Sequence, residues 1–490
     1  MKKPHFLLVS FPAQGHINPT LQLAKILVRL GAAATFVTPP KAYSRISSSF
    51  SITTTTTTIT SGISFATISD GTESGSGVDS SDPMYPAQFE SHGPSSLAAL
   101  VRSFADSGRS VSCIVYNFLL PWVADVAVDL GVPSALLWIQ PSAVLAVYYH
   151  FIVKSPHLFT DLSQKIQLPG LPPLAAEELP SFVLPDNPFP LSVPIFCSMF
   201  RAVEESKSKW VLVNSFDALE ECVVSSLKEV NLDVIGVGPL IPSAFLDKKR
   251  SSDQDMAFGG DLHSPISGCN VMHWLDLKEA GSVLYASFGT LAMLSPVQVD
   301  EIAAGLLESG HYFIWVVRLP ENYGGFPAGF DEAVKKRGLL VKWCRQVEVL
   351  AHPSVGCFVT HSGWNSTLEG LVNGKPMVCV PQWSDQPTNA KLVEQVWRIG
   401  VRARKNQEGV VGREELKRCV NVVMGEESGK EMRKKALRWR ELAVEAATAD
   451  GGTSDRNIRT IIGYFKPEKE DDEKSIEQEP DIARLELAVA

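Results

Sequence analysis

A continuous apolar run at Val355–Thr360 leads directly into a turn of small and polar residues, 361–367, and then into a helical pattern with Leu368 and Leu371 as its apolar positions. A buried strand that feeds such a turn leaves free backbone N–H groups, and the positive end of the helix dipole, in front of the helix. This arrangement binds anions such as phosphate. The stretch therefore predicts a parallel α/β sheet with an anion site at the end of a strand.

Residues in and around this turn offer groups for each part of a nucleotide. Gly363 lets the backbone approach a phosphate. Polar side chains lie around it at His361, Asn365 and Ser366. Trp343 offers a flat face on which a base could stack, and Glu369 offers a carboxylate for two ribose hydroxyls. Taken singly, each residue is more typical of a core or a turn, and only their combination indicates a nucleotide site.

The whole run from Trp343 to Gln386 resembles the signature box of the plant family-1 UDP-glycosyltransferases, both in length and at its fixed positions. Those positions are Trp343, Gln346, His361, Gly363, Trp364, Asn365, Ser366, Glu369, Pro381, Asp385 and Gln386. The resemblance implies a GT-B fold, with two Rossmann-like, doubly wound domains that face each other across a cleft. It also implies transfer of glucose from UDP-glucose to a small acceptor with inversion, without a metal or any further cofactor.

The same resemblance assigns candidate site residues by their positions. UDP would contact Ser287, Thr290, Trp343, Cys344, Gln346, His361, Gly363, Asn365, Ser366 and Glu369. The sugar would contact Trp364, Asp385 and Gln386. The acceptor would contact Gln14, Gly15, Ile139, Tyr148, Phe196 and Phe200. For the aromatic members of this last group, a plain core position is the alternative.

Apolar runs recur along the chain with helical patterns between them, which is typical of βαβ units. In the first half we expect strands at 5–11, Thr35–Val37, Ser112–Asn117, Ser134–Gln140, Trp210–Phe216 and Val234–Val237. In the second half we expect strands at Ser282–Ser287, Tyr312–Arg318, Leu339–Trp343, Val355–Thr360 and Met377–Val380. This pattern predicts two doubly wound domains independently of the resemblance.

Two helix starts carry recognisable caps. Asn18 and Pro19 predict the start of a helix that stops at Gly31. In the second half, a capped helix is predicted by Ser295 at the cap, Pro296 at the first helical position and Gln298 as the partner in a capping box.

The domain organisation follows from these patterns. We expect the first domain at 1–244, a polar linker at 245–263, the second domain at 264–453, a helix at 454–465, and a charged, solvated or disordered tail at 466–490. The resemblance implies that the helix at 454–465 crosses back to the first domain. The Ser/Thr-rich tract 47–61 and the Gly/Ser-rich stretch 71–82 are expected to be surface loops. The linker contains a D-x-D run at 253–255, which other glycosyltransferases use for metal, but no strand precedes it and we do not interpret it as a metal site.

Composition argues against several kinds of partner and location. The net charge is −9 and no dense basic block is present, which argues against nucleic acid. No apolar run approaches the roughly 20 residues that span a membrane. The eight cysteines stand singly, without C-x-x-C pairs, which is typical of a reduced, cytoplasmic protein. The sequence leaves the oligomeric state open, and a monomer is our expectation.

His16 follows the first predicted strand, at the edge of the sheet where ligands collect. A histidine in such a turn is more often structural, but the resemblance makes it the base that takes the acceptor proton. Many relatives carry Asp, the partner of this histidine, where this chain has Asn117. An amide stabilises an imidazolium less well than a carboxylate, and the equivalent change in serine proteases costs about 10⁴ in rate. Ile139 departs too, because Thr or Ser is common there, near the sugar.

A weakened base favours acidic acceptors. Moving a proton from a phenol of pKa about 10 to a histidine near 6.5 is uphill by roughly 5 kcal/mol, whereas a carboxylic acid is already ionised at neutral pH. The segments Leu119–Trp122 and Trp138–Ser142 resemble a subgroup of the family with glucose-ester-forming and flavonoid-glucosylating members. We therefore hypothesise that the acceptor is a carboxylic acid or an acidic phenol such as a flavonoid hydroxyl.

Alternatives remain for the same chain. A UDP-sugar epimerase would need acids near the anomeric carbon and C2 and no second pocket for an acceptor. A UDP-sugar-binding protein, impaired in catalysis by the loss of the His16 partner, is opposed by the retention of His16, Asp385 and Gln386. A dehydrogenase lacks support because no G-x-G-x-x-G follows the first strand.

Overall fold

The computed structural model describes residues 3–49, 62–72, 82–187, 189, 191–206, 209–246, 258, 271–290, 294–320, 323–425, 427–448 and 451–465. Several predicted features lie wholly or largely outside these residues: the tract 47–61, the stretch 71–82, the linker 245–263 with its D-x-D run, and the tail 466–490.

Each half of the chain forms a parallel sheet. In spatial order the strands of the first sheet are β3 (Ser64–Thr67), β2 (Ala33–Thr38), β1 (His5–Val9), β4 (Cys113–Asn117), β5 (Ser134–Trp138), β6 (Val211–Val213) and β7 (Val234–Gly236). Those of the second sheet are β10 (Gly338–Val341), β9 (Tyr312–Val316), β8 (Val283–Ser287), β11 (Val355–Thr360), β12 (Met377–Cys379) and β13 (Gly400–Arg402). Strand order reverses at β1/β4 in the first sheet and at β8/β11 in the second, and ligands collect at such switch points.

Helices connect the strands in both halves. Those of the first half are α1 (Gln14–Arg29), α2 (Pro40–Ser49), α3 (Tyr85–Asp106), α4 (Trp122–Asp129), α5 (Ser142–Tyr149), η2 (His150–Lys154), η3 (Pro156–Phe159), η4 (Ala176–Glu178), η5 (Ser181–Val183), α6 (Ser192–Glu205), α7 (Asp217–Glu229) and η6 (Ser243–Phe245). Those of the second half are α8 (Val271–Asp276), α9 (Pro296–Ser309), α10 (Phe330–Arg337), α11 (Gln346–Ala351), α12 (Trp364–Val372), α13 (Gln386–Lys391), η8 (Leu392–Val396), α14 (Arg413–Met424), α15 (Glu427–Ala447) and α16 (Thr453–Tyr464).

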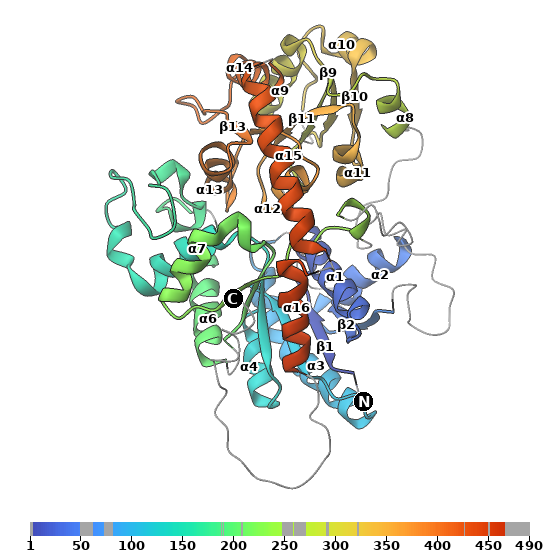
Figure 1. Ribbon diagram of the computed structural model, residues 1–490, viewed down its shortest axis with the longest axis vertical. Helices are drawn as coiled ribbons and strands as arrows, with labels where there is room; N and C mark the ends of the chain where they lie inside the picture. Colours follow the sequence, from blue (N-terminus) through green and yellow to red (C-terminus); the bar gives the residue numbers. More distant parts are fainter. Residues whose placement is uncertain are drawn as a thin grey trace.

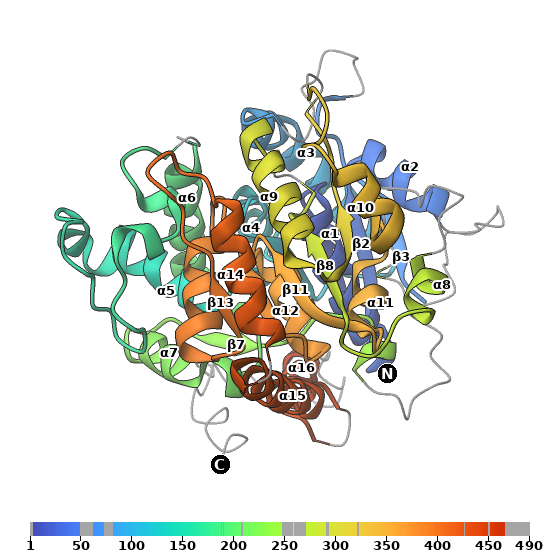
Figure 2. The same cartoon turned by 90° about the horizontal axis from the view of Figure 1, so that it is seen from above.

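The two sheet domains are stacked along the long axis of the molecule, and α15 runs from the second domain toward the first (Figure 1). α16 continues in that direction and lies on the first domain, while both helices keep to one side of the two sheets (Figure 2). Asn457 Nδ2 donates to the carbonyl of Gly236 at 2.9 Å, and the ring of Phe465 packs edge-on against Phe6. The last helix thus joins the two halves. The domain boundaries stated above stay predictions.

The first helix begins earlier than Asn18 and Pro19 predict. α1 starts at Gln14, so Pro19 lies inside it. Proline has no N–H to donate to the carbonyl four residues before it, here that of Gly15. That carbonyl instead accepts a hydrogen bond of 2.8 Å from Asn365 Nδ2 of the other domain. The prediction of a cap at Asn18 was wrong, because a proline within the first turns of a helix can resemble one at its start.

The predicted start of α9 is confirmed at Ser295 and revised at Gln298. Ser295 Oγ accepts from the backbone N–H of Gln298 at 3.2 Å, and Pro296 takes the first helical position. The Gln298 side chain does not close a capping box. It pairs with the backbone of Val411, whose carbonyl lies 3.0 Å from Nε2 and whose N–H lies 2.9 Å from Oε1.

Two short edge strands, β3 and β13, carry too few apolar residues to stand out in the sequence. Several predicted strands also run past their observed ends, as at Trp343, which follows β10. In both domains the polar residues of the site therefore lie at the last residues of the strands or on the turns that follow them.

We expect Gln298→Met to destabilise the protein more than Ser295→Ala. The first leaves two buried backbone groups of Val411 without partners, at about 1–3 kcal/mol each, and the second removes one helix cap at about 1 kcal/mol. Equilibrium denaturation in urea would compare them. A smaller loss for Gln298→Met than for Ser295→Ala would contradict this assignment.

Candidate active site

The turns at the two switch points meet at the domain interface. His16 lies in the first turn of α1, after β1, and Asn117 is the last residue of β4. Opposite them, Ser287 ends β8 and His361 follows β11. The contact between Asn365 and the carbonyl of Gly15 connects the two sides directly.

The ring of His361 is enclosed between two glycines. A Cβ atom on Gly289 would come within 2.6 Å of His361 Nε2, and one on Gly363 within 2.5 Å. Burial lowers the pKa of His361 to about 4, and the backbone of Ser287 opposes this shift only in part. The ring is therefore neutral at physiological pH. Its Nδ1 is buried, and no described residue forms a hydrogen bond with it.

The turn before α12 is held by the helix that carries the proposed sugar residues. Ser362 has φ +65°, a left-handed conformation uncommon for residues other than glycine. Asn389 Nδ2, on α13, donates to the Ser362 carbonyl at 2.8 Å and to Asp385 Oδ2 at 2.6 Å. Asn389 was missed by the sequence analysis because its role depends on a contact between two elements.

Gln346 is the centre of a polar network at the proposed ribose position. Its Nε2 donates to Ser366 Oγ at 2.9 Å and to Glu369 Oε2 at 2.8 Å, and its Oε1 accepts from the Tyr285 hydroxyl at 3.2 Å. Cys344 Sγ lies 3.4 Å from that same hydroxyl, and burial raises the pKa of Cys344 to about 11. Gln346 thus orients the Glu369 carboxylate. Tyr285, inside an apolar strand, gave no signal in the sequence.

Two further residues predicted to contact UDP follow strands of the second sheet. Trp343 is half-buried between β10 and α11, and Thr290 is half-buried in the turn after β8. Partial exposure leaves their surfaces accessible at the carboxyl ends of the strands, where both were expected.

The residues predicted to contact the sugar are buried at the start of α13 and α12. Gln386 Oε1 accepts the backbone N–H of Gln382 at 2.8 Å. Burial raises the pKa of Asp385 to about 6, against hydrogen bonds from Asn389 and from the backbone of Trp364. The Trp364 indole donates to the carbonyl of Asn214 at 2.7 Å, so its side chain forms a contact between the two domains. Only the backbone of Trp364 faces the Asp385 carboxylate.

His16 is partly exposed, but its Nδ1 is buried and lies within hydrogen-bond distance of no partner in the described part of the chain. Burial lowers the pKa of His16 to about 3, and the Asn117 amide opposes this shift without cancelling it. Asn117 Oδ1 accepts from the backbone N–H of Phe11 at 3.0 Å, which fixes the orientation of the amide. Its Nδ2 then donates to Thr20 Oγ1 at 3.1 Å. Asn117 therefore holds β1, β4 and α1 together, and both polar atoms of its amide bond groups other than His16.

The residues predicted to line the acceptor site divide into two groups. His16 packs on Phe11 and Phe118, and rings continue from Phe118 through Phe196 to Tyr148, which stacks on Phe196 at 4.3 Å. Near these rings, Ile139 is buried at the end of β5, and Gln14 Nε2 donates to Asn18 Oδ1. Phe200 lies apart and packs on Tyr149. All three predicted aromatic residues are buried, so the core alternative remains compatible with the structure.

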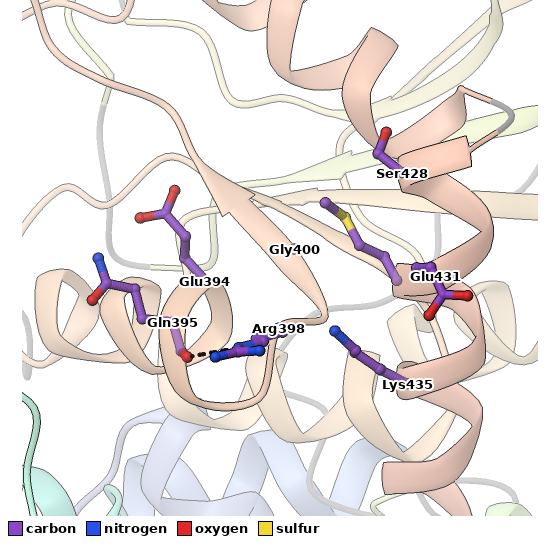
Figure 3. Close-up of a pocket in the computed structure, with 8 residues that line it drawn as sticks. Glu394, Gln395, Arg398, Gly400, Ser428, Glu431 and Lys435 are labelled. Atoms are coloured by element: carbon purple, nitrogen blue, oxygen red, sulfur yellow. Dashed lines mark hydrogen bonds between the residues drawn. The ribbon is translucent and has the colours of Figure 1, made fainter.

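A surface pocket of about 480 Å³ lies away from this interface, between η8, β13 and α15 (Figure 3). It is lined by Glu394, Gln395, Arg398, Gly400, Ser428, Glu431, Met432 and Lys435. None of the predicted site residues lines it. Carboxylates and cations alternate around it, so it offers no single charge to a ligand.

Within the described ranges, no three His, Cys, Asp or Glu side chains are grouped so that they could hold a metal ion. In the same part of the chain, no helix has both the length and the apolar character needed to cross a membrane.

Known proteins resemble this chain over nearly all of its length. A family model described as UDP-glucoronosyl and UDP-glucosyl transferase matches residues 243–438. Crocetin glucosyltransferase, chloroplastic, from Gardenia jasminoides is 44% identical over 94% of this chain and 97% of its own length. Phloretin 4'-O-glucosyltransferase from Malus domestica is 42% identical, over 95% of this chain and 98% of its own. The crystal structure of Os79 from O. sativa in complex with UDP matches with a TM-score of 0.81 and 33% identity, over 94% of this chain and 100% of that one.

The chain belongs to the plant family-1 UDP-glycosyltransferases, and the predicted GT-B fold is confirmed. It is a UDP-glucose-dependent glucosyltransferase that acts on a small plant acceptor. The individual roles of its site residues stay predictions.

We expect Gly363→Ala to weaken UDP binding without unfolding the protein. The backbone of Gly363 has φ −59°, which alanine adopts freely, but the new methyl group would displace the His361 ring. Calorimetric titration with UDP should show at least a tenfold loss of affinity. Gly463→Ala is the control, because nothing lies within 4 Å of its Cβ position. Unchanged UDP affinity in Gly363→Ala would contradict the role given to His361.

We expect the stability difference between Asp385→Asn and the wild type to depend on pH. The folded protein holds the Asp385 proton up to about pH 6, whereas an unfolded chain releases it near 3.8. The wild type therefore loses stability as pH rises from about 4 to 6, by about 3 kcal/mol in total, and Asp385→Asn does not. Urea denaturation at pH 4.5 and 7.5 measures this. An equal difference at both pH values would refute the raised pKa.

Proposed function

We propose that this enzyme transfers glucose from UDP-glucose to an acceptor that loses its proton easily, either a carboxylic acid or an acidic phenol, with His16 as the base. The observation that supports this most directly is the environment of His16. Its ring is desolvated, and among the described residues no carboxylate pairs with Nδ1 to stabilise the imidazolium; only the neutral Asn117 amide opposes the lowering of the pKa.

The energetics of proton transfer favour acidic acceptors. With the pKa of His16 lowered to about 3, taking a proton from a phenol of pKa about 10 is uphill by roughly 10 kcal/mol before any help from the transition state. Taking one from a carboxylic acid of pKa about 4 is uphill by only about 1 kcal/mol, and at neutral pH the acid is already ionised. An electron-poor phenol lies between these limits. An aliphatic alcohol, with a still higher pKa, is the poorest match.

The aromatic surroundings of His16 support a flat acceptor. Phe11 and Phe118 pack on the His16 ring with centroids 5.3 and 5.2 Å away. Such faces stack well on a planar ring system. The names of two relatives, crocetin glucosyltransferase and phloretin 4'-O-glucosyltransferase, indicate acceptors of small-molecule size.

The leaving group and the sugar would be held from the opposite domain. The first turn of α12 supplies free N–H groups and a positive dipole for the diphosphate, next to the neutral His361. Asp385 and Gln386 would accept and donate hydrogen bonds to the glucose hydroxyls, and Glu369, oriented by Gln346, would hold the ribose. With the base and the leaving group on opposite domains, attack from the His16 side inverts the anomeric carbon.

Other features of the enzyme also stay proposals. The site would need no metal, because the helix dipole and polar side chains can neutralise the departing diphosphate. We further propose that the enzyme is monomeric and cytoplasmic. The epimerase and the non-catalytic alternatives lose support from relatives that are themselves glucosyltransferases.

The test compares wild type with Asn117→Asp on matched carboxylate, flavonol and aliphatic alcohol acceptors. We expect the wild type to prefer the carboxylate or the flavonol over the alcohol by at least tenfold in kcat/KM. Asn117→Asp would place a carboxylate beside His16 and favour its protonated form. We expect it to raise kcat/KM for phenol and alcohol acceptors about tenfold or more.

The carboxylate acceptor is the internal control, since it arrives without a proton and should change less than threefold. Initial rates of UDP release, with products identified by mass spectrometry, give both comparisons. A clear preference of the wild type for aliphatic alcohols, or an equal gain for all three acceptors, would show that the acidity of the acceptor is not what the site selects.

A further inference from the structure

A segment of the first domain, residues 175–184, forms hydrogen bonds and ion pairs with the second domain beside the proposed sugar site. We call this segment the strap. The Ser181 N–H donates to the carbonyl of Ser384 at 2.9 Å, and Ser181 Oγ accepts the N–H of Ser384 at 2.7 Å. Thr388 Oγ1, on α13, donates to the carbonyl of Glu178 at 2.8 Å. The strap therefore binds the residues on either side of Asp385 and Gln386.

The strap also contributes one member to a buried group of three charges. The Glu178 carboxylate lies 2.9 Å from Lys391 Nζ and 2.8 Å from Arg402 Nη2, and the side chains of all three are at most 5% exposed. The backbone N–H of Ala175 also donates to this carboxylate at 3.0 Å. Burial alone would raise the pKa of Glu178, but these donors and cations outweigh it and lower the pKa, so the group is ionised. Glu178 comes from the first domain and both cations come from the second.

The geometry links this charge group to the sugar residues through a single helix. α13 has Asp385 at its N-cap, Gln386 at its first position and Lys391 at its last. Arg402 ends β13, next to it. Lys391 and Asp385 therefore lie at opposite ends of one short helix, which connects the charge group to the sugar residues. The diphosphate turn precedes α12 and is linked to α13 through Asn389, which donates to the Ser362 carbonyl. It also has direct contacts with the first domain that do not involve α13, Asn365 with Gly15 and Trp364 with Asn214, and these stay in place when the anchor of α13 is removed.

The strap also contacts an aromatic residue that was predicted to line the acceptor site. Phe182 packs on Phe196 at 6.0 Å and edge-on against Trp383 at 5.9 Å, directly before Ser384. A single short segment thus contacts the rings that extend from His16 and the turn that leads to the sugar residues. Its position suits it to set the distance between the two substrates.

We propose that Glu178 is a positioning residue, which anchors α13 to the first domain through Lys391 and Arg402 and thereby aligns the donor sugar with the acceptor. This inference rests on the assignment of Asp385 and Gln386 to the sugar. It predicts that loss of the strap contacts lowers the rate of glucose transfer from UDP-glucose but leaves the affinity for UDP unchanged.

Two variants test the anchor in different ways. Glu178→Gln removes the shared carboxylate but leaves two buried cations, which could impair folding. Lys391→Met removes the charged contact between α13 and Glu178, while the Glu178–Arg402 pair keeps its balanced charge, so this variant should stay folded. For both we expect kcat/KM for UDP-glucose to fall at least tenfold, while the Kd for UDP, measured by calorimetry, stays within twofold of the wild type.

Glu394→Gln is the matched control. Glu394 lies on η8, which continues from α13, and its carboxylate accepts the backbone N–H of Arg402 at 2.9 Å. It is one of the residues that line the surface pocket (Figure 3), and its carboxylate contacts the Arg402 backbone rather than the Glu178 carboxylate. Since glutamine can accept the same hydrogen bond, we expect transfer within twofold of the wild type.

The outcomes separate the inference from the function on which it rests. If Lys391→Met loses UDP affinity by the same factor as transfer, or keeps full transfer, the positioning role is wrong. If Asp385→Asn transfers glucose as well as the wild type, the sugar assignment is wrong and the positioning role fails with it. If Asp385→Asn loses transfer but Lys391→Met does not, only the role of the strap is overturned.

Discussion

Two parallel sheets can act on one pair of substrates only if their carboxyl edges face each other, and the whole architecture depends on this constraint. In each sheet the polar groups of the site lie at the carboxyl ends of the strands, near the point where the strand order reverses. The contacts across the interface are specific and polar: an amide to a helix carbonyl, an indole to a carbonyl, a serine pair and a buried charge group. Apolar burial would hold the domains together in many orientations, whereas these directional contacts select one.

Burial sets the electrostatics of both sides of the site. His16 and His361 are kept neutral because their rings are desolvated, while Asp385 is pushed toward its protonated form by the same cause. Buried groups of this kind cost stability, which functional sites commonly sacrifice. The charge group around Glu178 differs, because opposite charges there compensate one another.

The sequence predicted much of the fold because local patterns decide it. β11 was predicted with its observed ends, since a run of six apolar or small residues between polar turns has few other interpretations. The interpretation of Pro19 was wrong because a proline, which lacks an N–H, is compatible with two positions. It can start a helix, or it can lie inside one if the carbonyl four residues earlier has another donor. Here that donor, Asn365, comes from the other domain. β13 was missed because three residues at a sheet edge hardly differ from a loop.

Site residues were proposed from the sequence through resemblance, but their partners were not. Nothing in the signature run indicates that the Trp364 indole reaches Asn214, or that Tyr285 and Gln346 share a hydrogen bond. These contacts join residues far apart in the chain, and local spacing contains no information on them. The role of Glu178 was invisible for the same reason, because its partners lie more than two hundred residues away.

The proline within α1 has a consequence for how the two halves recognise each other. A residue that lacks a donor creates, one helical turn earlier, an oxygen that its own helix cannot use. Here that oxygen is offered outward and the second half supplies the missing hydrogen through Asn365. Any other amino acid at position 19 would bring its own hydrogen to the same oxygen and compete for it. A local defect in one helix thus becomes a docking point that only the correctly placed neighbour can complete.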